Sequence, residues 1–155
     1  MLNIDDVAVA QYSGPARAAL DYTLTTKRLA ESAKQSSAGV DHWAPLGELV
    51  ATEEFERIGN FKEVMNWTEY VEFLTNWAGS SAWDASFKRV SEIDGRAYLE
   101  LEERSEIGDF KSVVNSLAVF EFNDAGLITH IDVYLQMEML DPDMFKSYDG
   151  VEISG

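Results

Sequence analysis

The chain has 155 residues, of which 46% are apolar, and a formal net charge of -16. This length and composition predict one folded domain with a hydrophobic core rather than a disordered chain. The 28 acidic residues outnumber the 12 basic ones, and Lys and Arg are scattered. Binding to nucleic acid or to an anionic membrane is therefore disfavoured, because phosphate recognition requires gathered positive charge.

Cysteine is absent and histidine occurs only twice, so the sequence excludes disulfides, a thiolate nucleophile and cysteine-ligated metal. We expect no metal site and no cofactor, since no nucleotide-binding, serine-hydrolase or metal-binding motif is present. The first fourteen residues carry acids where a signal peptide carries bases, and no apolar run could span a membrane. These features predict a cytoplasmic protein without a membrane partner.

Helical patterns dominate the first half of the chain. Residues 1–14 are expected to form an arm, and a long helix is expected over 16–35, after Pro15, which suits a first helical position. Asp41 is a candidate N-cap for a short helix over 42–51. A short strand over 53–61 follows, and Asn66 is expected to cap a third helix that Gly79 ends.

From Trp83 onward the apolar period changes from helical spacing to strict alternation, which is typical of half-buried strands. Strands are expected over 83–93, 97–106, 110–122 and 127–137, and the turn Asp94-Gly95 is a strong hairpin signal. Helices followed by an antiparallel meander predict an α+β fold. We expect a single domain over 1–155, with its core at about 16–137 and a C-terminal tail over 138–155.

The last of these strands carries a polar stripe on one face, formed by His130, Asp132, Tyr134 and Gln136. The alternation predicts that Ile131, Val133 and Leu135 point inward and that the stripe points outward, where it would make polar contacts with a second subunit. A bulge could reverse this register and bring Asp132 and His130 to an active site, where an Asp–His pair suits proton transfer. Both interpretations remain open.

The strand over 114–122 is apolar on both faces. A sheet with two dry faces needs cover on both sides, and the helices can cover only one of them. A second subunit is a natural cover for the other, so the sequence indicates a homodimer through the outer sheet face.

The stretches "FERIGNF" and "LAVFEFNDAGLITHIDVYLQ", together with this order of elements, resemble the nuclear transport factor 2-like superfamily. Its members include SnoaL-like polyketide cyclases, ketosteroid isomerases, limonene epoxide hydrolases and scytalone dehydratases. The resemblance implies a cone-shaped, curved antiparallel sheet wrapped around a long N-terminal helix with two shorter helices, as in a cystatin-like α+β barrel. It also implies a deep apolar pocket and a homodimer, but the fold by itself does not name the reaction.

Family site positions transfer poorly to this chain. The general base of the isomerases falls at Arg57, so it is either missing or supplied by Glu56 after a shift of one residue. Their two oxyanion donors fall at Ala33 and Ala118. The Arg and Asp of the epoxide hydrolases fall at Leu99 and Leu101, and their second Asp falls at Val133, next to Asp132. The usual chemistry of both groups is therefore disfavoured.

Three charged residues remain as catalytic candidates. Glu103 shares the face of Leu99 and Leu101, which points it toward the expected pocket, and Arg57 could lie in the same pocket. A carboxylate and a guanidinium in an apolar cone could polarise a carbonyl and move a proton, although a solvated strand end explains Glu103 equally well. Asp132 is the nearest match to the acidic residue that SnoaL-like cyclases use as general acid–base.

Large aromatic side chains are plentiful and fit a pocket for a ring-bearing or terpenoid ligand, while core packing explains each of them singly. The substrate-binding candidates are Tyr22, Trp43, Trp67, Tyr70 and Phe120. Of these, Tyr22 and Tyr70 could donate a hydrogen bond.

The sequence thus predicts a cofactor-independent acid–base enzyme that acts on a small apolar molecule, cyclic and of terpenoid or polyketide type. Isomerase, cyclase, dehydratase and epoxide-opening hydrolase all remain open. The alternative is a small-molecule-binding or dimerisation module of the same fold without catalysis.

Overall fold

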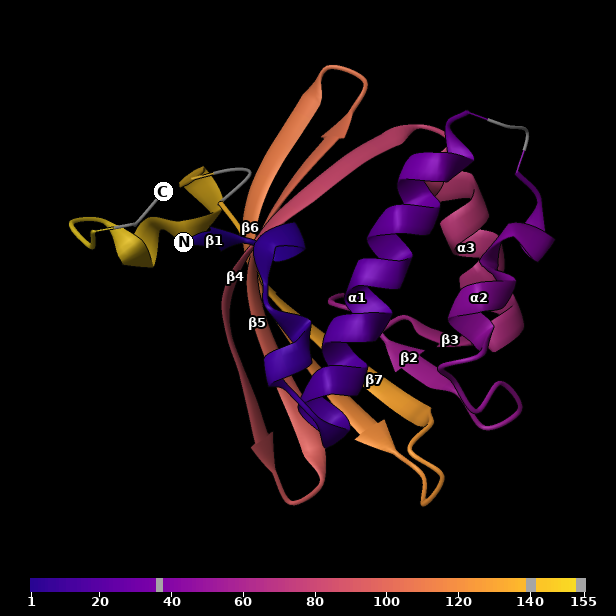
Figure 1. The fold of residues 1–155 in the computed structure, drawn as a ribbon. Coiled ribbons are helices and arrows are strands. Elements are labelled where there is room, and N and C mark those ends of the chain that lie inside the picture. Colours follow the sequence, from indigo (N-terminus) through magenta and orange to yellow (C-terminus); the bar gives the residue numbers. More distant parts are fainter. Residues whose placement is uncertain (36–37, 139–141, 153–155) are drawn as a thin grey trace.

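The computed structural model describes residues 1–35, 38–138 and 142–152 (Figure 1). It contains the helices α1 (Gly14–Ala33), α2 (Ala44–Gly47) and α3 (Trp67–Ala78) and one seven-stranded sheet, which confirms the α+β class. Short 3-10 turns occur at Ile4–Asp6, Val9–Gln11, Val40–Trp43 and Pro142–Tyr148. Part of the expected tail, at 139–141 and 153–155, lies outside the described residues.

No helix in the described ranges is long and apolar enough to cross a membrane.

The sheet has the strand order β1-β4-β5-β6-β7-β2-β3. Its strands are β1 (Leu2–Asn3), β2 (Glu56–Ile58), β3 (Val64–Asn66), β4 (Ser81–Ile93), β5 (Arg96–Ile107), β6 (Phe110–Phe122) and β7 (Ile128–Gln136). The expected four-stranded antiparallel meander is confirmed as β4 to β7. The sheet as a whole is mixed, because β2 runs parallel to β7. The sheet is curved and does not close into a barrel, since β1 and β3 form its two edges.

The long helix α1 lies across one face of the sheet, and α2 and α3 lie on the same side, next to β2 and β3 (Figure 1). The inner side of α1 buries Ala19 and Leu20 completely, against inward-facing residues of β5 and β6 such as Leu99 and Phe120. Small residues on a helix let it approach a sheet closely, and the buried apolar surface is the main source of stability here.

Local signals explain where several elements begin and end. Asn66 and Glu69 form a capping box at the start of α3, in which each side chain accepts a hydrogen bond from the other residue's backbone N–H. Asp94 and Gly95 both have positive φ, 52° and 75°, as a two-residue hairpin of type I′ requires. The expected second helix is reduced to one 3-10 turn and the four residues of α2.

The strand expected over 53–61 is only three residues long. It ends at Ile58 because the backbone turns back at Gly59, whose N–H donates to the carbonyl of Glu63. The returning segment forms β3, which pairs antiparallel with β2. This small hairpin places Arg57 between Met65 of β3 and Ile131 of β7.

Candidate functional site

Three polar side chains from three elements meet in the interior between the helices and the sheet. Tyr22 comes from α1, Tyr70 from α3 and Arg57 from β2. The guanidinium carbon of Arg57 lies 4.8 Å from the centroid of the Tyr70 ring, within the range of a cation–π contact. Phe120 of β6 packs edge-on against Tyr22, with ring centroids 5.7 Å apart. We call Tyr22, Tyr70 and Arg57 the interior cluster.

The hydroxyl of Tyr22 is buried, and no hydrogen-bond partner lies in bonding geometry among the described residues. Burial raises the pKa of Tyr22 well above its ordinary value. The Tyr70 hydroxyl, near that of Tyr22 but outside strict hydrogen-bond geometry, adds to this rise, while the positive charge of Arg57 opposes it. The group is therefore a neutral donor at any physiological pH. A buried hydroxyl without a partner costs free energy, so its position calls for a functional explanation.

Arg57 is half-buried. Within the part of the chain that the structure describes, it forms no ion pair with any carboxylate, although the chain is strongly acidic. Its contact in the cluster is the face of Tyr70. The cluster thus offers two hydroxyl groups and one cation without its own counter-ion, which together suit an oxygen atom that carries or develops negative charge.

Glu103 lies on the inner face of β5, as its parity with Leu99 and Leu101 predicts. It pairs across the sheet with Ala85 and Val114, and its carboxylate accepts a hydrogen bond of 2.7 Å from the indole N–H of Trp83. Its described partner is therefore Trp83 rather than a member of the interior cluster.

Asp132 lies on the outer face of the sheet. It pairs with Val119, whereas its neighbour Ile131 pairs with Phe120 and is buried. A bulge does occur in this hairpin, at Thr129, but it precedes the polar stripe and leaves both Ile128 and Ile131 pointing inward. The structure therefore does not bring Asp132 together with Arg57 or Glu103.

On that outer face His130 is held between two carboxylates. Its Nε2 lies 3.0 Å from Asp132 Oδ1, and its Nδ1 lies 3.3 Å from Glu56 Oε1. Among the described residues, no group of three or more His, Asp or Glu side chains has the arrangement of a metal site.

Two surface hollows are described, and neither is lined by the interior cluster, Glu103 or Asp132. One, of about 460 Å³, lies along the outer side of α1. The other, of about 320 Å³, lies between Val40–Trp43 and α3, and both Trp43 and Trp67 line it. Two of the expected substrate-binding aromatics are thus brought together, but away from Tyr22 and Phe120.

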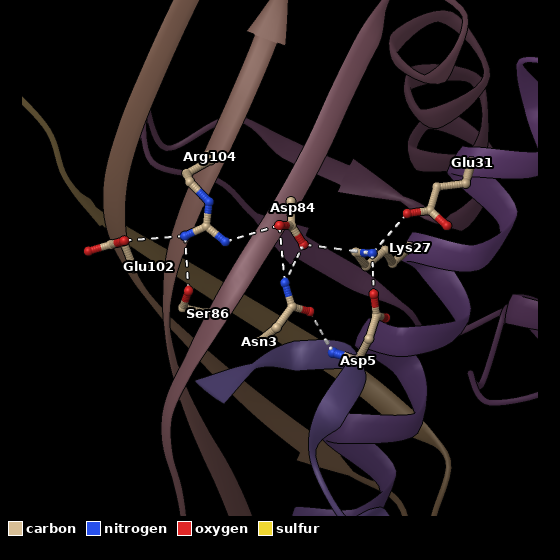
Figure 2. Close-up of polar contacts among 8 residues, drawn as sticks. All are labelled: Asn3, Asp5, Lys27, Glu31, Asp84, Ser86, Glu102 and Arg104. Atoms are coloured by element: carbon tan, nitrogen blue, oxygen red, sulfur yellow. Dashed lines mark hydrogen bonds and ion pairs between the residues drawn. The ribbon is translucent and has the colours of Figure 1, made fainter. Parts of the chain in front are cut away.

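The most connected polar network ties the N-terminal segment to the helix and the sheet (Figure 2). Lys27 is 8% exposed and lies 2.6 Å from Asp5, 2.8 Å from Glu31 and 3.7 Å from Asp84. Arg104 binds the other oxygen of Asp84 at 3.1 Å, and Asn3 donates to both.

Burial alone would lower the pKa of Lys27, but hydrogen bonds to Asp5 and Glu31 outweigh burial and raise it. Lys27 therefore stays charged at physiological pH. Only one feature of the sequence indicates this network, namely the spacing of Lys27 and Glu31, which are four residues apart on one helix.

Comparisons with known proteins bear on the fold. No protein-family model matches the sequence, and no curated protein matches it. Solved structures do match, and among them is a nuclear-transport-factor-2-like protein of unknown function from Cytophaga hutchinsonii, 10% identical, with a TM-score of 0.51 over 81% of this chain and 93% of that one. The chain has the nuclear-transport-factor-2-like fold.

Two Mycobacterium tuberculosis proteins share this fold. The protein RV0760c is 16% identical, with a TM-score of 0.59 over 82% of this chain and 99% of that one. An LEH-like epoxide hydrolase is 14% identical, with a TM-score of 0.53 over 73% of this chain and 84% of that one. These structures confirm the superfamily fold predicted from the sequence, while identities this low leave the reaction open.

Proposed function

We propose that this protein is a cofactor-independent acid–base enzyme that acts on a small apolar molecule, cyclic and of terpenoid or polyketide type. The observation that carries the proposal is the buried, unpartnered hydroxyl of Tyr22 beside Tyr70 and Arg57. Isomerisation, cyclisation, dehydration and epoxide opening share one requirement, which is the stabilisation of charge on a substrate oxygen. The similar epoxide hydrolase from M. tuberculosis supports this range of reactions.

In the proposed mechanism, Tyr22 donates a hydrogen bond to the reacting oxygen, and Arg57 supplies positive charge as that oxygen becomes negative. Donors held in place by a packed, water-poor interior act strongly because they need no reorganisation during the reaction. Glu103 lies on the same inner face of the sheet but six residues along β5 from Ala97, the partner of Phe120, and its carboxylate accepts from Trp83. The mechanism therefore assigns it no step at the interior cluster.

Neither of these two hollows reaches the interior cluster, so the proposal places the substrate beside Tyr22 and outside both of them. Side chains that can move apart are available there, because Met65 and Trp67 pack against the core while remaining partly exposed. Aromatic side chains such as Phe120 would then contact the apolar body of the substrate.

The test is a screen of cyclic ketones, epoxides and polyketide-like β-dicarbonyl compounds, with turnover followed by mass spectrometry. Tyr22→Phe should abolish most of any turnover that the wild type shows. Tyr12→Phe is the matched control, because Tyr12 contacts Phe87 outside the interior cluster. Equal loss in both variants, or no loss in Tyr22→Phe, would contradict the assignment.

The alternative is a binding module without catalysis. In that case calorimetry would detect ligands that remain chemically unchanged, and Tyr22→Phe would alter affinity alone. The absence of both turnover and binding across the screen would refute the enzyme and the module alike.

We further propose that the outer sheet face forms a homodimer. Val113 and Tyr134 are 59% and 57% exposed on that face, and large exposed apolar side chains beside a polar stripe are typical of protein interfaces. A Tyr134→Lys variant should shift the molar mass measured by light scattering from dimer to monomer. A wild-type protein that is already monomeric would rule this interface out.

A further inference from the structure

The groove between the turn Val40–Trp43 and helix α3 has a chemical character of its own. It has a volume of about 320 Å³, which is near the lower end of the range for small-molecule sites. None of Tyr22, Tyr70 and Arg57 lines it, but the ring of Trp67, which does, lies 6.3 Å from that of Tyr70. The groove therefore adjoins the interior cluster, and it differs from the cluster in the residues that would recognise a ligand.

The floor of this groove is apolar and aromatic. Trp43 is 1% exposed and Val71 is also buried, while Trp67 keeps part of its surface open. The indole N–H of Trp43 already donates to Thr75 at 3.1 Å. Trp43 therefore has no free donor to offer and forms the closed floor, while the partly exposed ring of Trp67 is the indole surface open to a ligand.

The rim of the groove is acidic. Asp41 and Glu72 stand on its two sides, both are exposed, and neither forms an ion pair with any other residue in the described ranges. No Lys, Arg or His lines the groove. The neighbouring His42 turns away, and its Nε2 contacts the Leu29 carbonyl and Ser32 on α1.

We propose that this groove binds an organic ammonium cation with a small apolar or aromatic body. Indole rings attract cations through their negative π-faces, and tryptophan does so best among the side chains. The two unpaired carboxylates add charge complementarity, and the net charge of -16 favours the approach of a cation. The positive end of the α3 dipole is offset by the Glu69 carboxylate in the capping box.

The probe for this site is 2-phenylethylammonium, titrated into ¹⁵N-labelled protein and followed by two-dimensional NMR. The chain has four tryptophans, so each titration contains its own control. The indole signals of Trp43 and Trp67 should shift in a saturable way, whereas those of Trp77 and Trp83 should not. Saturable shifts confined to Trp77 or Trp83, or no saturation at all, would overturn the proposal.

Neutral 2-phenylethanol has nearly the same shape and tests the role of charge. It should bind several-fold more weakly than the cation, and the difference should shrink at high salt, since exposed charges are screened. Equal affinity of the two probes would show that the groove binds only the apolar body of the ligand, and it would overturn the proposed ligand class.

Charge-removing variants locate the cation. Glu72→Gln and Asp41→Asn should each weaken binding of the ammonium probe about two- to fivefold, as expected for exposed charge pairs, and the double variant should weaken it further. Asp94→Asn, in the exposed β4–β5 turn, removes the same charge elsewhere and should leave affinity unchanged. If this control weakens binding as much as Glu72→Gln does, the effect belongs to net charge and the site is refuted.

Discussion

The guanidinium of Arg57 lies over the ring face of Tyr70, 4.8 Å from its centroid, with no carboxylate as its counter-ion in the described part of the chain. If this cation stabilises an oxyanion, Arg57→Met should lower kcat by about 10²- to 10³-fold, the usual loss for one such donor. Steady-state kinetics on a substrate found in the screen provide the measurement. Arg57→Lys should recover part of the loss, because it restores charge without the planar geometry.

Arg28 offers the control for that experiment. It is exposed on the surface of α1, away from the interior cluster, and Arg28→Met removes the same charge. A fall in kcat of similar size in Arg28→Met would indicate a general effect of charge and would remove Arg57 from the mechanism.

Tyr22→Phe should lower activity without lowering the stability of the fold. Its buried hydroxyl has no partner in strict bonding geometry among the described residues and interacts with the nearby Tyr70, so Tyr22→Phe removes a desolvation cost and no well-formed hydrogen bond. The free energy of unfolding should stay the same or rise by about 1 kcal/mol, while activity falls. Urea denaturation provides the measurement.

The matched variant for stability is Thr75→Val, which removes a hydroxyl that accepts from Trp43 and donates to the Val71 carbonyl. It should lower the free energy of unfolding by about 1–2 kcal/mol. If Tyr22→Phe destabilises the protein as much as Thr75→Val does, the Tyr22 hydroxyl makes a structural hydrogen bond and loses its proposed role.

Local patterns allowed most of the sheet to be predicted. Strict alternation and the turn at Asp94-Gly95 marked the four long strands, and the same alternation placed Asp132 on the outer face and Glu103 on the inner one. These inferences succeed because a period of two links each residue to a face without knowledge of distant contacts.

Strand pairings and side-chain contacts between segments far apart in the sequence could not be predicted from local patterns. The parallel pairing of β2 with β7 joins residues more than seventy positions apart, and only three residues of β2 take part. Lys27 resembled an ordinary exposed helix residue, and its burial arises from the N-terminal segment that folds over it. The meeting of Tyr22 with Arg57 likewise depends on how α1 crosses the sheet.

In the network around Lys27, neutralising the partner carboxylates should cost more stability than removing the lysine charge. Lys27 is 8% exposed, whereas Asp5 is 55% exposed. The double variant Asp5→Asn, Glu31→Gln leaves a buried ammonium with few partners and should lower the free energy of unfolding by about 2 kcal/mol, since unpaired buried charge is costly. Lys27→Met leaves only solvated carboxylates and should cost less. Denaturant unfolding of both proteins provides the comparison.

The control for this comparison lies on the same helix. Arg17 and Asp21 form an ion pair at 2.9 Å with both side chains about 40% exposed, so Asp21→Asn should change stability by less than about 0.5 kcal/mol. Lys27→Met keeps an unbranched apolar stem, so a larger loss in it than in the double variant would show that the ammonium still stabilises this region through Asp84 when Asp5 and Glu31 are neutral.

Asp84 should make the free energy of unfolding depend on pH in the acid range. Burial alone would raise the pKa of Asp84, but hydrogen bonds from Arg104, Asn3 and the Ala85 backbone and the charge of Lys27 together lower it. A carboxyl whose pKa is lower in the folded state than in the unfolded state stabilises the fold. This contribution is fully present above the unfolded-state pKa of about 3.9 and is lost as the pH falls through the folded-state pKa. Asp84→Asn should therefore be less stable than the wild type at pH 7, and the difference should shrink as the pH is lowered below about 4. Unfolding free energies measured across this range test the point, and a difference that stays constant with pH would show that Asp84 acts through packing instead of charge.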